Sequence, residues 1–156
     1  MYSVCKLRKW NIVDLWKVSE ILYKCGKDMA QKRGLHHWDN IRLKWWIIIV
    51  LCTVRNDIFL VYKGQTAVAT FQIRKQNQLL TFQKLATSPE FAGNGTGTFC
   101  LNKIEELAKM EKYEEIICEV YDKSEHAIQF YQNRGYVIEG AVKTRKYNEW
   151  KLRKVL

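Results

Sequence analysis

Three glycines within five positions mark the stretch of this chain best suited to bind an anion. Gly93, Gly95 and Gly97 follow a strand-like segment, and a helical pattern of apolar residues begins directly after them. The first amides of a helix lack intrahelical partners and carry partial positive charge, and glycine allows a ligand close to the backbone. A strand, a glycine loop and a helix in this order predict a phosphate site made of main chain, with an ordinary tight turn as the alternative.

The loop fits neither of the two common nucleotide motifs well. It lacks the lysine of a Walker A loop, and Thr98 stands where a dinucleotide fingerprint would place its third glycine. It also comes at mid-chain, after a meander of strands, rather than in an early βαβ unit. The anion that the loop would hold therefore has to be identified from its surroundings.

The elements around the loop predict a mixed α+β domain that spans residues 1–156. The segment 41–54 is ambiguous, because its length favours a helix and its β-branched residues favour a strand. Asp122 and Glu125 would form a capping box for the last helix. Helices are expected at 12–33, 96–110 and 123–134. Strands are expected at 2–7, 57–62, 66–74, 79–87, 116–121, 136–142 and 149–156.

Composition predicts a basic protein of a reducing compartment. The net charge is +10. A surface of this kind either attracts a polyanion or is an ordinary solvated surface without such a partner. The five cysteines are an odd number without zinc or CxxC spacing, so we expect free thiols, a cytoplasmic location and no metal. The longest apolar run, 45–54, is too short to span a membrane, so we expect no membrane partner.

Two linked motifs resemble those of the GNAT superfamily of N-acetyltransferases. Ala92-Gly93-Asn94-Gly95-Thr96-Gly97 stands where the family has [QR]-x-x-G-x-[GA], so Ala92 replaces the usual Gln or Arg. Ser124 to Tyr131, followed by Gly135-Tyr136, stands where the family has N-x-x-A-x-x-x-Y and then a glycine and an aromatic residue. The order and separation of the motifs fit the family, and the resemblance covers about residues 56–156.

The resemblance implies a fold and a cofactor site. The fold would be a central mixed, mostly antiparallel sheet of six or seven strands, flanked by about four helices. Acetyl-CoA would lie where two neighbouring parallel strands, 79–87 and 116–121, splay apart. The residues implied to contact it are Leu85, Ala86, Thr87, Ala92, Gly93, Asn94, Gly95, Thr96, Gly97, Thr98, Ser124 and Tyr131.

The resemblance also implies a reaction, in which a primary amine of a small molecule or peptide attacks the thioester directly. A backbone amide near Leu85 would stabilise the tetrahedral oxyanion. Tyr131 would be the general acid that protonates the leaving thiolate, with a plain core tyrosine as the alternative. The candidates for the base are Glu119 first, and then His126, His36 and His37. The aromatic candidates for the acceptor site are Trp38, Trp45 and Trp46.

Two other functions stay open from the sequence. The basic tail 143–154 interleaves Tyr147 and Trp150 with Lys and Arg, a pattern that could stack bases and pair phosphates. We nevertheless favour a closing strand there and disfavour nucleic acid as a partner. The other alternative is a CoA-binding domain without catalysis. The acceptor amine and a homodimer also stay open.

Overall fold

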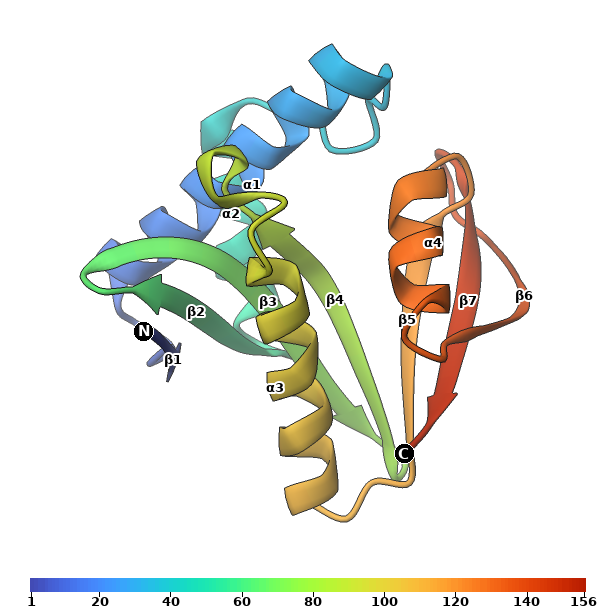
Figure 1. Cartoon of the computed structure of the whole chain (residues 1–156). Coiled ribbons are helices and arrows are strands. Elements are labelled where there is room, and N and C mark those ends of the chain that lie inside the picture. The colour runs from blue at the N-terminus through green and yellow to red at the C-terminus, as the bar shows by residue number, and fades with distance from the viewer.

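The computed structural model describes residues 1–156 and contains one seven-stranded sheet, in the order β1-β2-β3-β4-β5-β7-β6 (Figure 1). Only β4 and β5 pair in parallel, and every other neighbouring pair is antiparallel. The predicted mixed, mostly antiparallel sheet is therefore confirmed. The strands are β1 (Tyr2–Lys6), β2 (Asp57–Lys63), β3 (Thr66–Gln76), β4 (Leu79–Thr87), β5 (Glu115–Tyr121), β6 (Val137–Lys143) and β7 (Asn148–Val155).

Four α-helices cover the two faces of the sheet. They are α1 (Ile12–Arg33), α2 (Arg42–Cys52), α3 (Thr96–Met110) and α4 (Glu125–Gln132), and a short 3-10 turn, η1 (Pro89–Phe91), precedes the glycine loop. The larger of two apolar clusters packs α3 and α4 on one face, and the smaller packs α1 and α2 on the other. Each face is therefore stabilised by its own buried core.

The ambiguous segment 41–54 forms the helix α2. Trp45 and Ile49 are four residues apart and both are buried, so they form one apolar stripe that packs in the same cluster as Leu22 of α1. Tertiary packing therefore overrides the β-branched composition of the segment.

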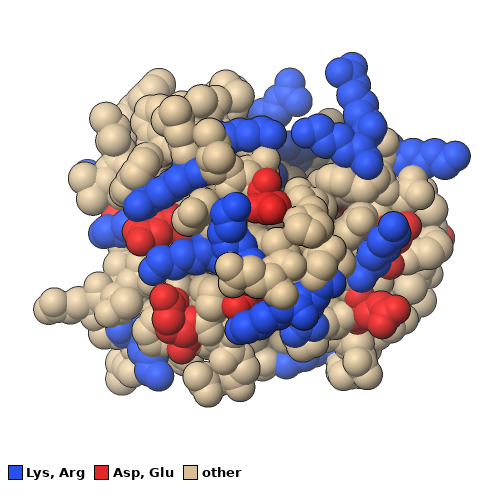
Figure 2. All heavy atoms as spheres, turned by 90° about the horizontal axis from the view of Figure 1, so that it is seen from above, with Lys and Arg blue, Asp and Glu red and all other residues tan.

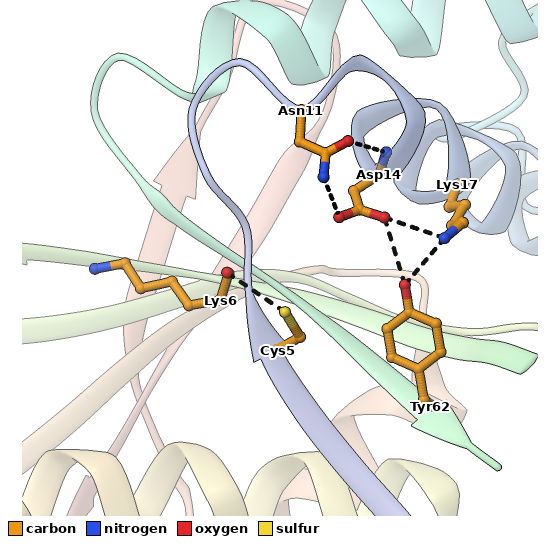
Figure 3. Close-up of polar contacts among 6 residues, drawn as sticks. All are labelled: Cys5, Lys6, Asn11, Asp14, Lys17 and Tyr62. Atoms are coloured by element: carbon orange, nitrogen blue, oxygen red, sulfur yellow. Dashed lines mark hydrogen bonds and ion pairs between the residues drawn. The ribbon is translucent and has the colours of Figure 1, made fainter. Parts of the chain in front are cut away.

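The start of α1 is tied to the sheet by a small polar network (Figure 3). The Asp14 amide donates to Asn11 Oδ1 over 3.2 Å, which confirms Asn11 as the N-cap. Lys17 Nζ donates to Asp14 Oδ1 over 3.1 Å and to the hydroxyl of Tyr62 on β2 over 3.2 Å. These contacts fix the helix that forms one wall of the cleft described below.

The sheet opens into a V between β4 and β5 (Figure 1). The two strands pair only over Leu80–Phe82 and Ile116–Cys118. Just beyond, β4 contains a bulge at which Lys84 takes a φ of 50°, and the register against β3 shifts by one residue. A bulge bends its strand and increases the twist, so β4 turns away from β5. The predicted splay between these two parallel strands is confirmed.

The expected start of α4 is wrong. Asp122 does not cap the helix, because its amide donates to the carbonyl of Asn148 over 3.1 Å and so stays in the ladder with β7. The chain is free to turn only after this bond, and Ser124 becomes the N-cap residue, without a side-chain cap bond. The helix is accordingly shorter than the expected 123–134.

Two further expectations concern thiols and membranes. All five cysteines are free, and Cys100 and Cys118 are buried. None of the helices combines the length and hydrophobicity that crossing a bilayer requires.

Candidate functional site

The splay between β4 and β5 holds a cleft with two connected parts. The outer part is a cavity of about 440 Å³ that is walled by α1, β4, the glycine loop and α4. The inner part, of about 210 Å³, lies between β4, β5 and the segment around His37. Six residues line both parts, so the two form one continuous passage: Cys25, Met29, Leu85, Ser124, Ala127 and Tyr131.

The outer cavity has a wall of unpaired backbone donors. None of the six amides from Gly93 to Thr98 donates a hydrogen bond within the protein. Gly95 is the N-cap of α3 and has a φ of 80°, which glycine adopts without the strain that a side chain would add. These amides and the helix dipole together are suited to bind an anion such as a diphosphate.

The side chain of Thr96 holds this loop in place rather than facing the cavity. Its hydroxyl donates to the carbonyl of Phe91 over 3.1 Å and lies 2.8 Å from the hydroxyl of Tyr2 on β1. Thr96 is fully buried. The resemblance implied that Thr96 contacts acetyl-CoA. Its side chain instead holds the loop in the shape that exposes the free amides.

One edge of β4 is left without a partner along the passage. Pairing with β5 ends at Phe82, while Ala86 and Thr87 continue to pair with β3 on the other side. The β5-facing backbone groups of residues 83–87 are therefore open to an extended ligand, which can add as a strand would. Leu85 lines both cavities at this edge.

Tyr131 of α4 stands at the junction of the two cavities. Its side chain is 8% exposed and packs against Phe82 and Tyr136, with ring centroids 5.6 and 5.7 Å away. Its hydroxyl makes no hydrogen bond within the protein, while the residue lines both parts of the cleft. Burial raises the pKa of Tyr131 well above its ordinary value, so the phenol keeps its proton at neutral pH.

Two carboxylates from neighbouring strands meet in the inner cavity. Glu119 of β5 and Glu149 of β7 both line it. Burial and then the charge of Glu119 raise the pKa of Glu149 to about 7, against a smaller lowering by Lys84. Glu149 is therefore partly protonated at neutral pH, because burial and the nearby charge of Glu119 disfavour its ionised form.

An aromatic wall closes the inner cavity. The His37 ring lies 4.3 Å from that of Tyr121 and 5.9 Å from that of Tyr147. Burial lowers the pKa of His37 to about 4, so the imidazole is neutral at pH 7, and its Nδ1 is buried without a partner. Gly26 of α1 permits this arrangement, because a Cβ there would lie 2.2 Å from the carbonyl oxygen of Trp38.

The structure brings most of the sequence-predicted site residues together. Asn94 and Thr96 are the exceptions among the residues implied for the cofactor, since neither lines a cavity. Residues that do line the passage are Leu85, Ala86, Thr87, Ala92, Gly93, Gly95, Gly97, Thr98, Ser124 and Tyr131.

The candidates for a base are separated by the fold. Glu119 and His37 line the inner cavity, whereas His126 lines the outer one beside the glycine loop. His36 is exposed, with Nδ1 3.3 Å from Asp39. Of the three tryptophans considered for the acceptor, Trp38 lines the inner cavity, and Trp45 is buried in the core of α1 and α2.

Sequence reasoning missed Glu149, Cys25 and Arg134. Glu149 reaches the cleft because β7 inserts beside β5 and pairs Tyr121 with Glu149, which no local pattern reveals. Cys25 lies on the apolar stripe of α1 and looks like a core residue. Arg134 stands two residues after the end of α4, and only the packing of that helix brings it to the glycine loop.

The comparisons with known proteins agree with this architecture. Residues 16–136 match the acetyltransferase (GNAT) family, so the chain belongs to that family. The search of curated proteins finds no match.

Solved structures share the fold at low sequence identity. A PaiA N-acetyltransferase from Thermoplasma acidophilum, in complex with coenzyme A, has a TM-score of 0.77 and 16% identity over 100% of this chain and 99% of its own. The ribosomal-protein-S18-alanine N-acetyltransferase from Escherichia coli has a TM-score of 0.75 and 13% identity, over 99% of this chain and 94% of its own. A GNAT family acetyltransferase from Elizabethkingia anophelis with acetyl-CoA bound has a TM-score of 0.72 and 10% identity, over 99% and 98%.

Proposed function

We propose that the protein is an acetyl-CoA-dependent N-acetyltransferase that acetylates a primary amine. The observation that carries the proposal is the set of six free amides from Gly93 to Thr98 at one end of a passage with Tyr131 at its centre. Family membership and the CoA complexes of structural relatives support the choice of donor.

The residues present fit acetyl-CoA along the whole passage. The amides and the dipole of α3 suit the diphosphate, and the unpaired edge of β4 suits the amide-containing pantetheine arm. Arg134 and Arg33 also line the outer cavity and add positive charge where the phosphates would lie. The thioester would then reach the junction beside Leu85 and Tyr131.

Acetyl-CoA supplies the activated acetyl group. The protein supplies hydrogen-bond donors and a proton, and it orients the two reactants. In this proposal, a backbone amide of β4 near Leu85, beyond the part of β4 that pairs with β5, stabilises the oxyanion that forms when the amine attacks. In this proposal, the Tyr131 phenol, protonated at neutral pH, gives its proton to the departing thiolate. Its hydroxyl is free for that role because no protein group occupies it.

The chemistry of the cysteines in the cleft supports direct transfer rather than an acyl-cysteine intermediate. Cys25 and Cys118 line the inner cavity. Burial raises the pKa of Cys25 to about 11 and that of Cys118 still further. The thiolate is the nucleophilic form, so these thiols are poor acceptors of the acetyl group at neutral pH.

Ion pairs hold three of the six Lys and Arg side chains of the basic tail, which weakens the case for nucleic-acid binding. Lys151 and Arg153 pair with Glu139, Arg153 also pairs with Glu115, and Lys154 pairs with Glu105 over 2.8 Å. Cations already held by carboxylates contribute less to phosphate binding. The face at the open end of the V still carries many Lys and Arg side chains (Figure 2), where a polyphosphate ligand would enter.

The test combines binding and turnover. Acetyl-CoA should raise the melting temperature, because a ligand of the native state stabilises it. The variant Tyr131→Phe should keep that shift and lose about 100-fold in thiol release with an amine acceptor. The absence of an acetyl-CoA shift would refute the proposal, and equal turnover in both proteins would remove Tyr131 from the mechanism.

A further inference from the structure

We infer that the inner cavity accepts a small arylalkylamine: a primary ammonium group on a flat apolar body, with no carboxylate beside the nitrogen. The inference rests on the proposed function and adds the chemical class of the acceptor. It is carried by the side chains that line this cavity, by its size and by its opening toward Tyr131.

The first observation is the charge of the cavity. In a chain of net charge +10, the inner cavity is lined by two glutamates, Glu119 and Glu149, and by one cation, Lys84. Neither glutamate takes part in a salt bridge, whereas Glu105, Glu115 and Glu139 do. Two carboxyl groups without a cationic partner attract an ammonium ion and repel a substrate carboxylate.

The second observation is the aromatic wall. The rings of Tyr121 and Tyr147 lie 5.2 Å apart, and both contact His37, which is neutral at pH 7. Such a wall packs against a flat apolar group, and ring faces also attract a cation. At about 210 Å³ the cavity is smaller than the 300–1,000 Å³ typical of drug-sized ligands, so it suits a compact amine.

The third observation is an unpartnered polar group that opens into the same cavity. The Tyr131 side chain is more than nine-tenths buried, and its hydroxyl has no hydrogen-bond partner in the protein. Because no protein group bonds to it, the hydroxyl is available to a ligand in the cavity. The reacting nitrogen would therefore lie between Tyr131 and the pair of glutamates.

This arrangement also accounts for the protons of the reaction. The ammonium gives one proton to the carboxylate of the Glu119–Glu149 pair, and the neutral amine attacks the thioester carbon. The N–C bond forms, the C–S bond breaks, and the nitrogen loses a second proton. The thiolate takes a proton from Tyr131, the second nitrogen proton returns to Tyr131, and the glutamate pair releases the first proton to solvent.

Several groups face the pair and set the pH at which it works. Lys84 approaches from β4, His37 from the segment after α1, and Tyr121 and Tyr147 from β5 and the turn before β7. Of these, Lys84 opposes the effect of burial and of Glu119 on Glu149. The pair should therefore impose an acid limb on the rate profile near neutral pH.

Three matched probes test the class of acceptor. Phenethylamine, phenylalanine amide and phenylalanine share the aromatic ring, and only phenylalanine carries a carboxylate beside the nitrogen. At saturating acetyl-CoA, we expect kcat/KM for phenethylamine and for the amide to exceed that for phenylalanine by at least about tenfold. A preference for phenylalanine, or no turnover of any of the three, overturns the inference.

Variants of the glutamates separate this inference from the proposed function. Glu149→Gln should raise KM for phenethylamine about tenfold, move the acid limb of the pH profile and reduce the discrimination against phenylalanine. The control, Glu106→Gln on α3, removes an exposed carboxylate outside the cleft and should change none of these. If Glu149→Gln matches the control while acetyl-CoA still binds, the acceptor inference fails and the donor site stands. If acetyl-CoA does not bind to the unaltered protein, the proposed function itself fails.

Discussion

The guanidinium of Arg134, just after α4, donates a hydrogen bond to the hydroxyl of Thr98 in the first turn of α3. This contact joins the two arms of the V beside the glycine loop, and the Arg134 guanidinium also lies 4.0 Å from the ring centroid of Phe130. Both residues of the hydrogen bond line the outer cavity. The positive charge of Arg134 is therefore held where a diphosphate bound to the free amides would lie. It also lies close to Ala92, which stands where the resemblance expects a Gln or Arg side chain.

Arg134→Met should weaken acetyl-CoA binding by about tenfold, because hydrogen bonds to charged groups contribute about 1.5–3 kcal/mol and part of this is screened by solvent. Titration calorimetry at two salt concentrations measures the change, and the variant should show the weaker salt dependence. Arg8→Met, which removes an exposed positive charge before α1, is the matched control. Equal affinities in the two variants would exclude Arg134 from the phosphate site.

Ala92→Gln should strengthen acetyl-CoA binding by about fivefold. Ala92 lines the outer cavity with φ −68° and ψ 150°, a conformation that any residue adopts without strain. A glutamine there adds a donor beside the diphosphate, worth roughly 1 kcal/mol. The thermal shift produced by a fixed concentration of acetyl-CoA reports the gain, with Ala92→Leu as a control for added bulk. An equal shift in both variants would show that no polar contact forms.

Gly95→Ala and Gly97→Ala should differ in stability although they lie two residues apart. A side chain at Gly95 is strained by its φ of 80° and costs about 1–2 kcal/mol, or several degrees of melting temperature. A Cβ at Gly97 would meet ring atoms of Phe130 at 3.5 and 3.7 Å, which are ordinary contacts. Thermal unfolding without ligand should therefore show a loss for Gly95→Ala only, and similar melting temperatures would contradict this account of the loop.

Glu149→Gln should stabilise the protein more at pH 8 than at pH 5. Burial and Glu119 raise the pKa of Glu149 from 4.5 to about 7, so the folded state holds this proton more tightly than the unfolded chain. That contribution is fully present below pH 4.5 and is lost as the pH rises through 7. A neutral glutamine avoids the loss, with an expected gain of roughly 1 kcal/mol after solvent screening. Thermal unfolding at both pH values measures it, and an equal difference at pH 5 and pH 8 would contradict the raised pKa.

The local part of this structure could be read from the sequence. The helix Ile12–Arg33 has the predicted bounds, since Asn11 caps it and Gly34 ends it in the left-handed conformation. The strand Leu79–Thr87 and the helix Thr96–Met110 also match their predictions. Periodicity, caps and turns act over a few residues, so they leave their signal in consecutive positions.

Where local signals conflict, the tertiary structure decides. The segment 41–54 becomes α2 because Trp45 and Ile49 pack against α1, and the expected capping box at Asp122 is lost because Asn148 holds the backbone there. The bulge at Lys84 contains no glycine, so the sequence did not predict it, yet it helps to open the sheet.

The site divides in the same way. The sequence by itself determined the proposed anion-binding half, because six consecutive amides at the start of one helix come from a single short motif. Only the tertiary structure decided the proposed acceptor half, in which Glu119, Glu149 and His37 come from three distant segments. The physical reason is that β7 lies beside β5 and Gly26 lets the chain at Trp38 rest on α1. Such contacts depend on the pairing and packing of whole elements, and the sequence near each residue carries no record of them.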